Sequence, residues 1–136
     1  MLYTSSGLLF IVIGLLFIHW IGDFVCQTHW QAINKSKSIK ALSIHIGTYT
    51  AVLAILTYVL FAVTNLLTIT IFYSLASLIA FIVANGVLHF ITDYVTSKIN
   101  AHLWETKQIH EFFTMIGFDQ FLHYAALLGT LWFFIL

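Results

Sequence analysis

The sequence contains no proline and no arginine, and it has only one cysteine among 136 residues. Because proline removes a backbone donor and breaks helices, its absence leaves long helices uninterrupted. A chain with no arginine and zero net charge lacks the basic surface that binds nucleic acid, so we expect no nucleic-acid partner. The single cysteine, Cys26, excludes an internal disulfide.

Charged residues are also scarce, at 7% of the chain, whereas hydrophobic residues make up 61% and aromatic residues 17%. Soluble proteins typically carry about 25% charged residues. A soluble fold of this size could not bury so much apolar surface, whereas a lipid bilayer can accept it. We therefore expect a single transmembrane domain over residues 1–136, with the lipid bilayer as its main partner. The N-terminus lacks the basic segment of a cleavable signal, so the first apolar stretch is expected to be retained.

Long uncharged stretches predict four membrane-spanning helices. Residues 41–92 carry no formal charge and are too long for one crossing of a hydrocarbon core about 30 Å thick. They are expected to form two helices with a turn at 64–68. The four expected spans are residues 5–26, 42–63, 69–95 and 117–136. The expected fold class is an all-α, integral membrane four-helix bundle.

The lysines predict the orientation of the chain. All five lie in the loops that join spans one to two and three to four: Lys35, Lys37, Lys40, Lys98 and Lys107. The positive-inside rule places these loops in the cytoplasm and both termini outside, as in a multi-pass protein of the inner membrane. The second of these loops, residues 96–116, mixes apolar and polar residues. It is expected to form either an interfacial helix lying on the membrane or an ordered loop.

A short internal repeat divides the chain into two helical hairpins. Residues 18–25 align with residues 88–95, and each copy contains a histidine followed four positions later by an aspartate. Each second helix then carries a histidine near its start, His45 and His123. The pattern predicts two pseudo-repeated hairpins of the same orientation, related by an axis along the membrane normal.

Three of the five acidic residues lie four positions from a histidine. The pairs are His19/Asp23, His89/Asp93 and Asp119/His123. Residues at this spacing share one face of a helix. Together with His45, all three pairs fall at the cytoplasmic ends of the expected spans, which is how a helix bundle assembles a metal site. Gln27, Asn85 and Gln120 are expected to support these ligands through hydrogen bonds.

A divalent metal ion would explain why these residues lie within apolar helices. A charged aspartate costs roughly 2.5–3.5 kcal/mol at the centre of a span. Nitrogen and oxygen ligands without a thiolate suit zinc, manganese or iron better than calcium or copper(I), and zinc is favoured. The seven residues could hold one ion with supporting partners, or two ions sharing a carboxylate. The alternative is that each pair is only a hydrogen bond between helices, worth about 1 kcal/mol.

Four ordered motifs extend over nearly the whole chain. They are HxxxDFxxQ at residues 19–27, NKSKS at 34–38, HxxxD at 89–93 and DQxxH at 119–123. On these residues the chain resembles a bacterial and phage family of membrane proteins that is classed as a domain of unknown function. It departs from the family pattern at Cys26 and His29, and neither position belongs to a His–Asp pair. The resemblance implies a polytopic membrane protein and supplies no reaction.

No established catalytic motif is found, so a hydrolytic nucleophile would have to be a metal-bound water. One of Asp23, Asp93 and Asp119 would then act as general base. The first hypothesis is therefore a metal-dependent hydrolase of a membrane-associated substrate, such as a phospholipid or an isoprenoid phosphate. The second is a small transporter or channel, which would be a homo-oligomer. The third is a structural membrane subunit whose His–Asp pairs only lock helices together.

Overall fold

The computed structural model describes residues 5–64 and 75–136, and within these ranges the chain is helical with no strand. Its elements are α1 (Ser5–Trp20), a π-helix η1 (Ile21–Val25), α2 (His29–Asn34), α3 (Ile39–Val63), α5 (Leu75–Glu105) and α6 (Ile109–Phe134). The expected all-α class is confirmed. The turn expected at 64–68 lies outside the described residues after Thr64, as does the start of the third expected span.

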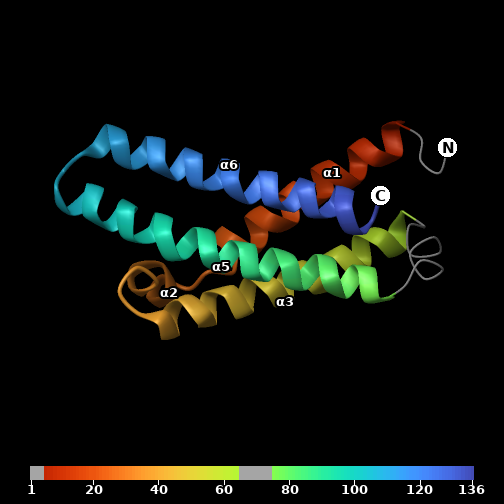
Figure 1. Ribbon diagram of the computed structural model, residues 1–136, viewed down its shortest axis with the longest axis horizontal. Helices are drawn as coiled ribbons and strands as arrows, with labels where there is room; N and C mark the ends of the chain where they lie inside the picture. Colours follow the sequence, from red (N-terminus) through yellow and green to blue (C-terminus); the bar gives the residue numbers. More distant parts are fainter. Residues whose placement is uncertain (1–4, 65–74) are drawn as a thin grey trace.

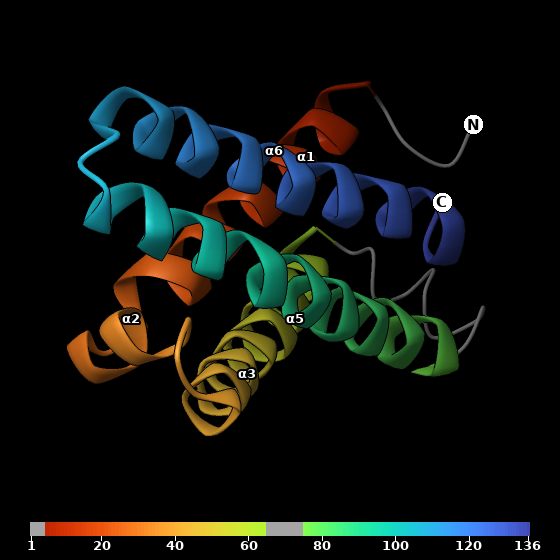
Figure 2. The same cartoon turned by 60° about the vertical axis from the view of Figure 1, so that its left-hand side comes forward.

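The four long helices run antiparallel to their chain neighbours. Figure 1 shows the start of α1 and the end of α6 at one end of the molecule, with α2 and the connection between α5 and α6 at the other. Helix α5 packs against both α3 and α6, while α1 packs against α3 and α6. Figure 2 shows α3 and α5 side by side and α6 along the other side of α5. The lysine-bearing segments between these helices therefore lie at one common end.

Three helical segments are long and apolar enough to cross a membrane. They are Ser6–Val25, Ile39–Val63 and Leu75–Glu105. Helix α6, on which the fourth expected span falls, is not among them. The polar residues Asp119, Gln120 and His123 lie along α6 and lower its mean hydropathy.

The distribution of side chains is the reverse of that in a soluble protein. Large apolar residues face outward on the long helices, and Trp132 and Phe133 are 77% and 78% exposed. By contrast, the side chains of His19 and His45 are completely buried. Soluble proteins rarely expose wide apolar patches while burying ionisable groups. An apolar exterior combined with buried ionisable side chains supports a membrane location.

The segment 96–116 differs from both forms that the sequence predicted. Helix α5 continues to Glu105 and α6 already begins at Ile109, so the segment is the tip of a helical hairpin. Its turn contains Lys107 with a φ of 59°. The loss of hydrophobicity after residue 95 marks the end of the apolar stretch, but no proline or glycine is present there to end the helix. The rings of Trp104 and Phe112, with centroids 5.1 Å apart, join the two arms of the hairpin.

Two short elements between α1 and α3 were not predicted. Helix α2 begins with a capping box, in which the Thr28 hydroxyl accepts from Gln31 N and the Gln31 side chain accepts from Thr28 N. The π-helix η1 ends α1 with a bond from Cys26 N to Ile21 O at 2.8 Å, five residues back. Such π-turns are rare in proteins, and those that occur are often found at functional sites. Here the turn contains Asp23.

An apolar core fills the half of the molecule that lies away from the lysine-bearing end. Its buried members are Ile11, Leu15, Ile18, Tyr49, Leu53, Phe61, Leu78, Phe81, Leu127 and Leu131. All four long helices contribute to it. The core therefore fixes the helices against one another and determines where their polar ends meet.

Candidate metal centre

The structure brings all seven histidines and aspartates of the predicted cluster together, and none is more than 9% exposed. Each long helix contributes to the cluster. The residues are His19 and Asp23 from α1 and η1, His45 from α3, His89 and Asp93 from α5, and Asp119 and His123 from α6. We refer to these seven residues as the His/Asp cluster.

Four members of the cluster form a first group that could hold a metal ion: Asp23, His45, His89 and Asp93. Each offers one ligand atom, and these atoms all lie within 4.8 Å of one another. Nε2 of His45 is 3.2 Å from an oxygen of Asp23 and 3.2 Å from one of Asp93. Nε2 of His89 is 3.3 Å and 3.6 Å from the same two oxygens. Two imidazoles and two carboxylates thus face a common point.

A second group shares one residue with the first. It consists of Asp23, Asp119 and His123. Nε2 of His123 is 3.4 Å from Asp119 Oδ1 and 3.3 Å from Asp93 Oδ1, so it borders the first group as well. The arrangement therefore offers ligands for one ion, or for two ions with Asp23 between them.

His19 lies beside both groups rather than within them. The Tyr49 hydroxyl donates to its Nδ1 at 3.1 Å, and its Nε2 donates to Gln120 Oε1 at 3.2 Å. The same Nε2 is 3.6 Å from Asp23 Oδ2. The four-residue and three-residue groups do not include His19, and its predicted role as a ligand stays a prediction.

Both ring nitrogens of His89 are buried and have no hydrogen-bond partner among the described residues. The ring is held between those of Tyr49 and His123, with centroid separations of 4.0 Å on each side. A buried polar group without a partner is rare in a folded protein and requires an explanation. A lone pair on Nε2 directed at a metal ion provides one.

Two of the three predicted supporting residues contact the cluster. Gln27 Nε2 is 3.1 Å from His45 Nδ1. Gln120 Nε2 donates to Asp23 Oδ2 at 3.0 Å and to Asp119 Oδ2 at 3.1 Å, which connects the two ends of the second group.

Asn85, the third predicted supporting residue, bonds elsewhere. Its amide donates to Phe81 O and to Thr130 Oγ1, both at 2.7 Å. Asn85 lies one helical turn before His89, toward the apolar core. Its spacing of four from His89 correctly placed it on the same face of α5, but this spacing could not show that Asn85 lies too far along the helix to contact the cluster.

Sequence reasoning missed three residues that contact the cluster. Lys35 Nζ is 2.9 Å from Asp93 Oδ2, the Thr96 hydroxyl donates to Asp119 Oδ1 at 2.6 Å, and Tyr49 bonds His19. Tyr49 follows His45 by four positions, so the same spacing rule could have found it. No such rule finds Lys35, because its position depends on the unpredicted helix α2.

With its four imidazoles in the neutral form that binds a metal, the cluster carries more negative than positive charge. Three buried carboxylates face the ammonium group of Lys35, which leaves an excess of two negative charges. Burial lowers the pKa of Lys35, but the carboxylates of Asp93 and Asp23 outweigh this effect and raise it above 10.5. Lys35 therefore stays charged at neutral pH. One divalent ion bound by neutral imidazoles would cancel the remaining charge.

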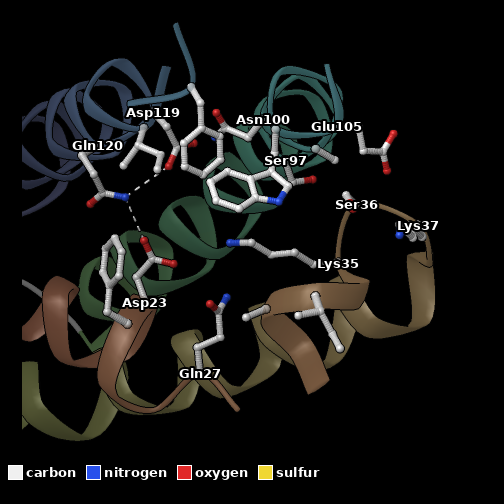
Figure 3. A pocket seen from close by; sticks show the side chains of 17 residues that line it. Asp23, Gln27, Lys35, Ser36, Lys37, Ser97, Asn100, Glu105, Asp119 and Gln120 are labelled. Carbon is white, nitrogen blue, oxygen red and sulfur yellow. Dashed lines mark hydrogen bonds between the residues drawn. The ribbon is translucent and has the colours of Figure 1, made fainter. Parts of the chain in front are cut away.

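A cavity of about 650 Å³ opens beside the cluster at the lysine-bearing end. Figure 3 shows Asp23, Asp119 and Gln120 at one end of this cavity and Ser36, Lys37 and Glu105 toward the other. Asp93 and the four histidines do not line it. Two carboxylates of the cluster are thus accessible from the cavity, while the rest of the cluster lies behind them.

The fold and site define a class: an all-helical protein with three helices apolar enough to cross a membrane and a buried His/Asp cluster that could hold a metal ion. The chain belongs to the DUF3307 family, described as proteins of unknown function, whose model matches residues 11–135. This confirms the expected domain of unknown function. No curated protein and no solved structure matches the chain.

Proposed function

We propose that this chain is an integral membrane protein that binds a divalent metal ion in its His/Asp cluster and uses it to hydrolyse a membrane-associated substrate. The observation that carries the proposal is the convergence of buried imidazole nitrogens and carboxylate oxygens from η1, α3 and α5 on one point, with a second group from η1 and α6 beside it. Zinc is the preferred ion, ahead of manganese and iron, because the ligands are nitrogen and oxygen atoms without a thiolate.

The separations within the first group suit a metal site. Ligand atoms about 2.0–2.2 Å from a tetrahedral zinc lie about 3.3–3.6 Å from one another. The four nitrogen–oxygen distances of the first group are 3.2, 3.2, 3.3 and 3.6 Å. The two made by His89 exceed the roughly 2.7–3.2 Å of an ordinary hydrogen bond.

The hydrogen bond of Gln27 is also compatible with metal binding. The oxygen and nitrogen of a glutamine amide exchange places when the amide is turned over, and their assignment follows from the hydrogen-bond network. With Gln27 Oε1 facing Nδ1 of His45, the ring donates to the amide and presents the lone pair of Nε2 to the ion.

The proposal includes a four-helix bundle in which α6 is the fourth span. The polar residues of α6 that lower its hydropathy, Asp119 and His123, are buried against the other helices, while Phe121 and Phe133 face outward. Lipid would therefore meet apolar side chains on α6. With the lysine-bearing end in the cytoplasm, both termini lie outside and the cluster faces the cytoplasm, at the inner membrane.

Asp119 is the residue best placed to act as general base. It lines the cavity, is the most exposed carboxylate of the cluster at 9%, and is oriented by Thr96 and Gln120. In the hydrolytic step, the oxygen of the activated water forms a bond to the substrate as the bond to the leaving group breaks. The Asp119 carboxylate takes the proton from the water and returns it to the leaving group.

Replacing Asp119 by asparagine is expected to lower hydrolysis by about 10²- to 10⁴-fold, which is the typical contribution of a general base. The first group, which lacks Asp119, is expected to keep its metal. Purified protein is incubated with vesicles containing lipid phosphates, products are followed by mass spectrometry, and metal content is measured in parallel. Glu111→Gln, an exposed carboxylate on the same helix, serves as the control. Undiminished turnover in Asp119→Asn would remove Asp119 from the mechanism.

The two alternative functions predict different results. A transporter would show ion flux into liposomes that disappears with Asp93→Asn. The apolar core beyond the cluster, with Leu15, Phe81 and Leu127 fully buried, weighs against such a path. A structural subunit would lose stability with the same substitution and would contain no metal.

A further inference from the structure

On one side of the cavity beside the cluster, two buried polar side-chain atoms have no hydrogen-bond partner within the described residues. Ser97 is 9% exposed, and its buried Oγ has no hydrogen-bond partner among the described residues. Asn100 Oδ1, one turn further along α5, is in the same situation. Figure 3 shows both residues on the α5 side of the cavity, with the Lys35 side chain extending beneath them. Unpartnered buried groups of this kind call for a polar partner, which a ligand in the cavity would supply.

The remaining wall is apolar and continues toward the outer surface. Ile33, Trp104, Phe112 and Ile116 line this part of the cavity. Trp104 and Ile33 are 58% and 54% exposed, so the apolar wall reaches the outside of the molecule. A volume of about 650 Å³ falls within the range of about 300–1,000 Å³ that is usual for small-molecule sites. The cavity therefore suits a molecule with a polar end and an apolar chain.

The charges that line the cavity determine which polar end it can accept. Two lysines, Lys35 and Lys37, face three carboxylates, Asp23, Asp119 and Glu105. The lining alone thus has one excess negative charge and disfavours an anion. Asp93, which lies behind the lining and pairs with Lys35, adds a second excess negative charge, and a divalent ion bound to Asp23 and Asp93 cancels both. An anionic group then has the ion and the Lys35 ammonium as partners, and the Ser97 hydroxyl as a donor.

We propose that this cavity binds a lipid with a terminal phosphate, and that it does so only after the metal has bound. The inference rests on the proposed metal site. A terminal phosphate fits because Asp23 and Asp119, which would border the ion, lie together at one end of the cavity, away from Lys37 and Glu105. The corresponding hydrolysis forms a bond from the water oxygen to phosphorus and breaks the phosphorus–oxygen bond to the lipid. Its products are a lipid alcohol and inorganic phosphate.

Binding of dioleoyl phosphatidic acid to maltoside-solubilised protein tests the inference. Tryptophan fluorescence follows the titration, because Trp104 lines the cavity. Metal-loaded protein is expected to show saturable binding that is lost after chelation. Inorganic phosphate and dioleoyl phosphatidylcholine are the two comparison ligands, and both are expected to bind at least 10-fold more weakly. Equal binding of inorganic phosphate would assign the site to free phosphate, and equal binding of phosphatidylcholine would make it an apolar site only. Either result overturns the inference.

Ser97→Ala provides a variant that should fold normally, because the Ser97 hydroxyl has no partner to lose within the described protein. It is expected to weaken binding of phosphatidic acid by about 10- to 100-fold, the value of one hydrogen bond to a charged group. Ser43→Ala, at an exposed position of α3, is the matched control. Metal-loaded protein that binds no phosphatidic acid would refute this inference alone, whereas protein without metal would refute the proposed function.

Discussion

Replacing Asp23 by asparagine is expected to weaken metal binding by more than 100-fold. Asp23 is the residue shared by both groups of possible ligands, and its Oδ1 lies 3.2 Å from His45 Nε2 and 3.3 Å from His89 Nε2. Loss of residues that merely support a ligand typically costs 10- to 100-fold in affinity, so loss of a charged ligand should cost more. Competition with a chromophoric chelator gives the affinity of the detergent-purified protein for zinc.

The matched control is Glu105→Gln, which removes one negative charge from the same cavity. Glu105 belongs to neither group of ligands, so this variant is expected to bind zinc within a few-fold of the original chain. If both variants lost affinity equally, the effect of Asp23 would be one of general charge rather than coordination. If neither lost affinity, zinc would bind elsewhere.

Replacing Lys35 by methionine is expected to destabilise the metal-free protein by about 3 kcal/mol. Its ammonium group lies 2.9 Å from Asp93 Oδ2, and the carboxylate is 1% exposed. Removing one partner of a buried ion pair typically costs about 3–5 kcal/mol because the other charge is left uncompensated. The lower end applies because the Lys35 side chain is 19% exposed. Thermal unfolding in detergent measures the effect, with Lys40→Met at an exposed position as the control.

The pH dependence of this contribution has a definite sign. The pKa of Lys35 is raised in the folded protein, so the pair stabilises the fold fully below pH 10.5 and loses its effect as the pH rises through the higher folded value. The stability difference between the original chain and Lys35→Met should therefore be constant near neutral pH. Bound metal should reduce this stability difference, because in the Lys35→Met variant the ion compensates the charge of Asp93 in place of the lysine. A variant as stable as Lys40→Met in the absence of metal would contradict the buried pair.

The meeting of the His–Asp pairs could be predicted because it depends on two simple rules. A spacing of four places each pair on one helix face, and antiparallel spans of similar length place His19, His89 and His123 at one end of the molecule. Both rules hold in the structure, where the ring centroids of these three histidines lie 4.0–5.6 Å apart. Neither rule says which atoms face one another, so the hydrogen bonds of His19 to Tyr49 and Gln120 could not be predicted.

The unpredicted parts depend on backbone geometry and on tertiary placement. Hydrophobicity determines where lipid ends but not where a helix ends, and so α5 and α6 extend beyond the apolar stretches on which they were predicted. The π-turn at Asp23 has no residue signature comparable to a capping box. Lys35 reaches Asp93 across 58 positions of sequence, and only the position of α2 brings them together. The predicted repeat of the two hairpins stays a prediction, since Asp23 lies in a π-helix and Asp93 in a regular α-helix.

The metal content of the protein purified in detergent, without added metal or chelator, tests the central claim most directly. Elemental analysis is expected to find at least one divalent ion per chain, with zinc foremost, and almost none in His45→Ala. His110→Ala, an exposed histidine outside the cluster, should keep the full amount. A wild-type chain that contains no divalent ion, and takes none up on dialysis against zinc, manganese or iron(II), would contradict the account.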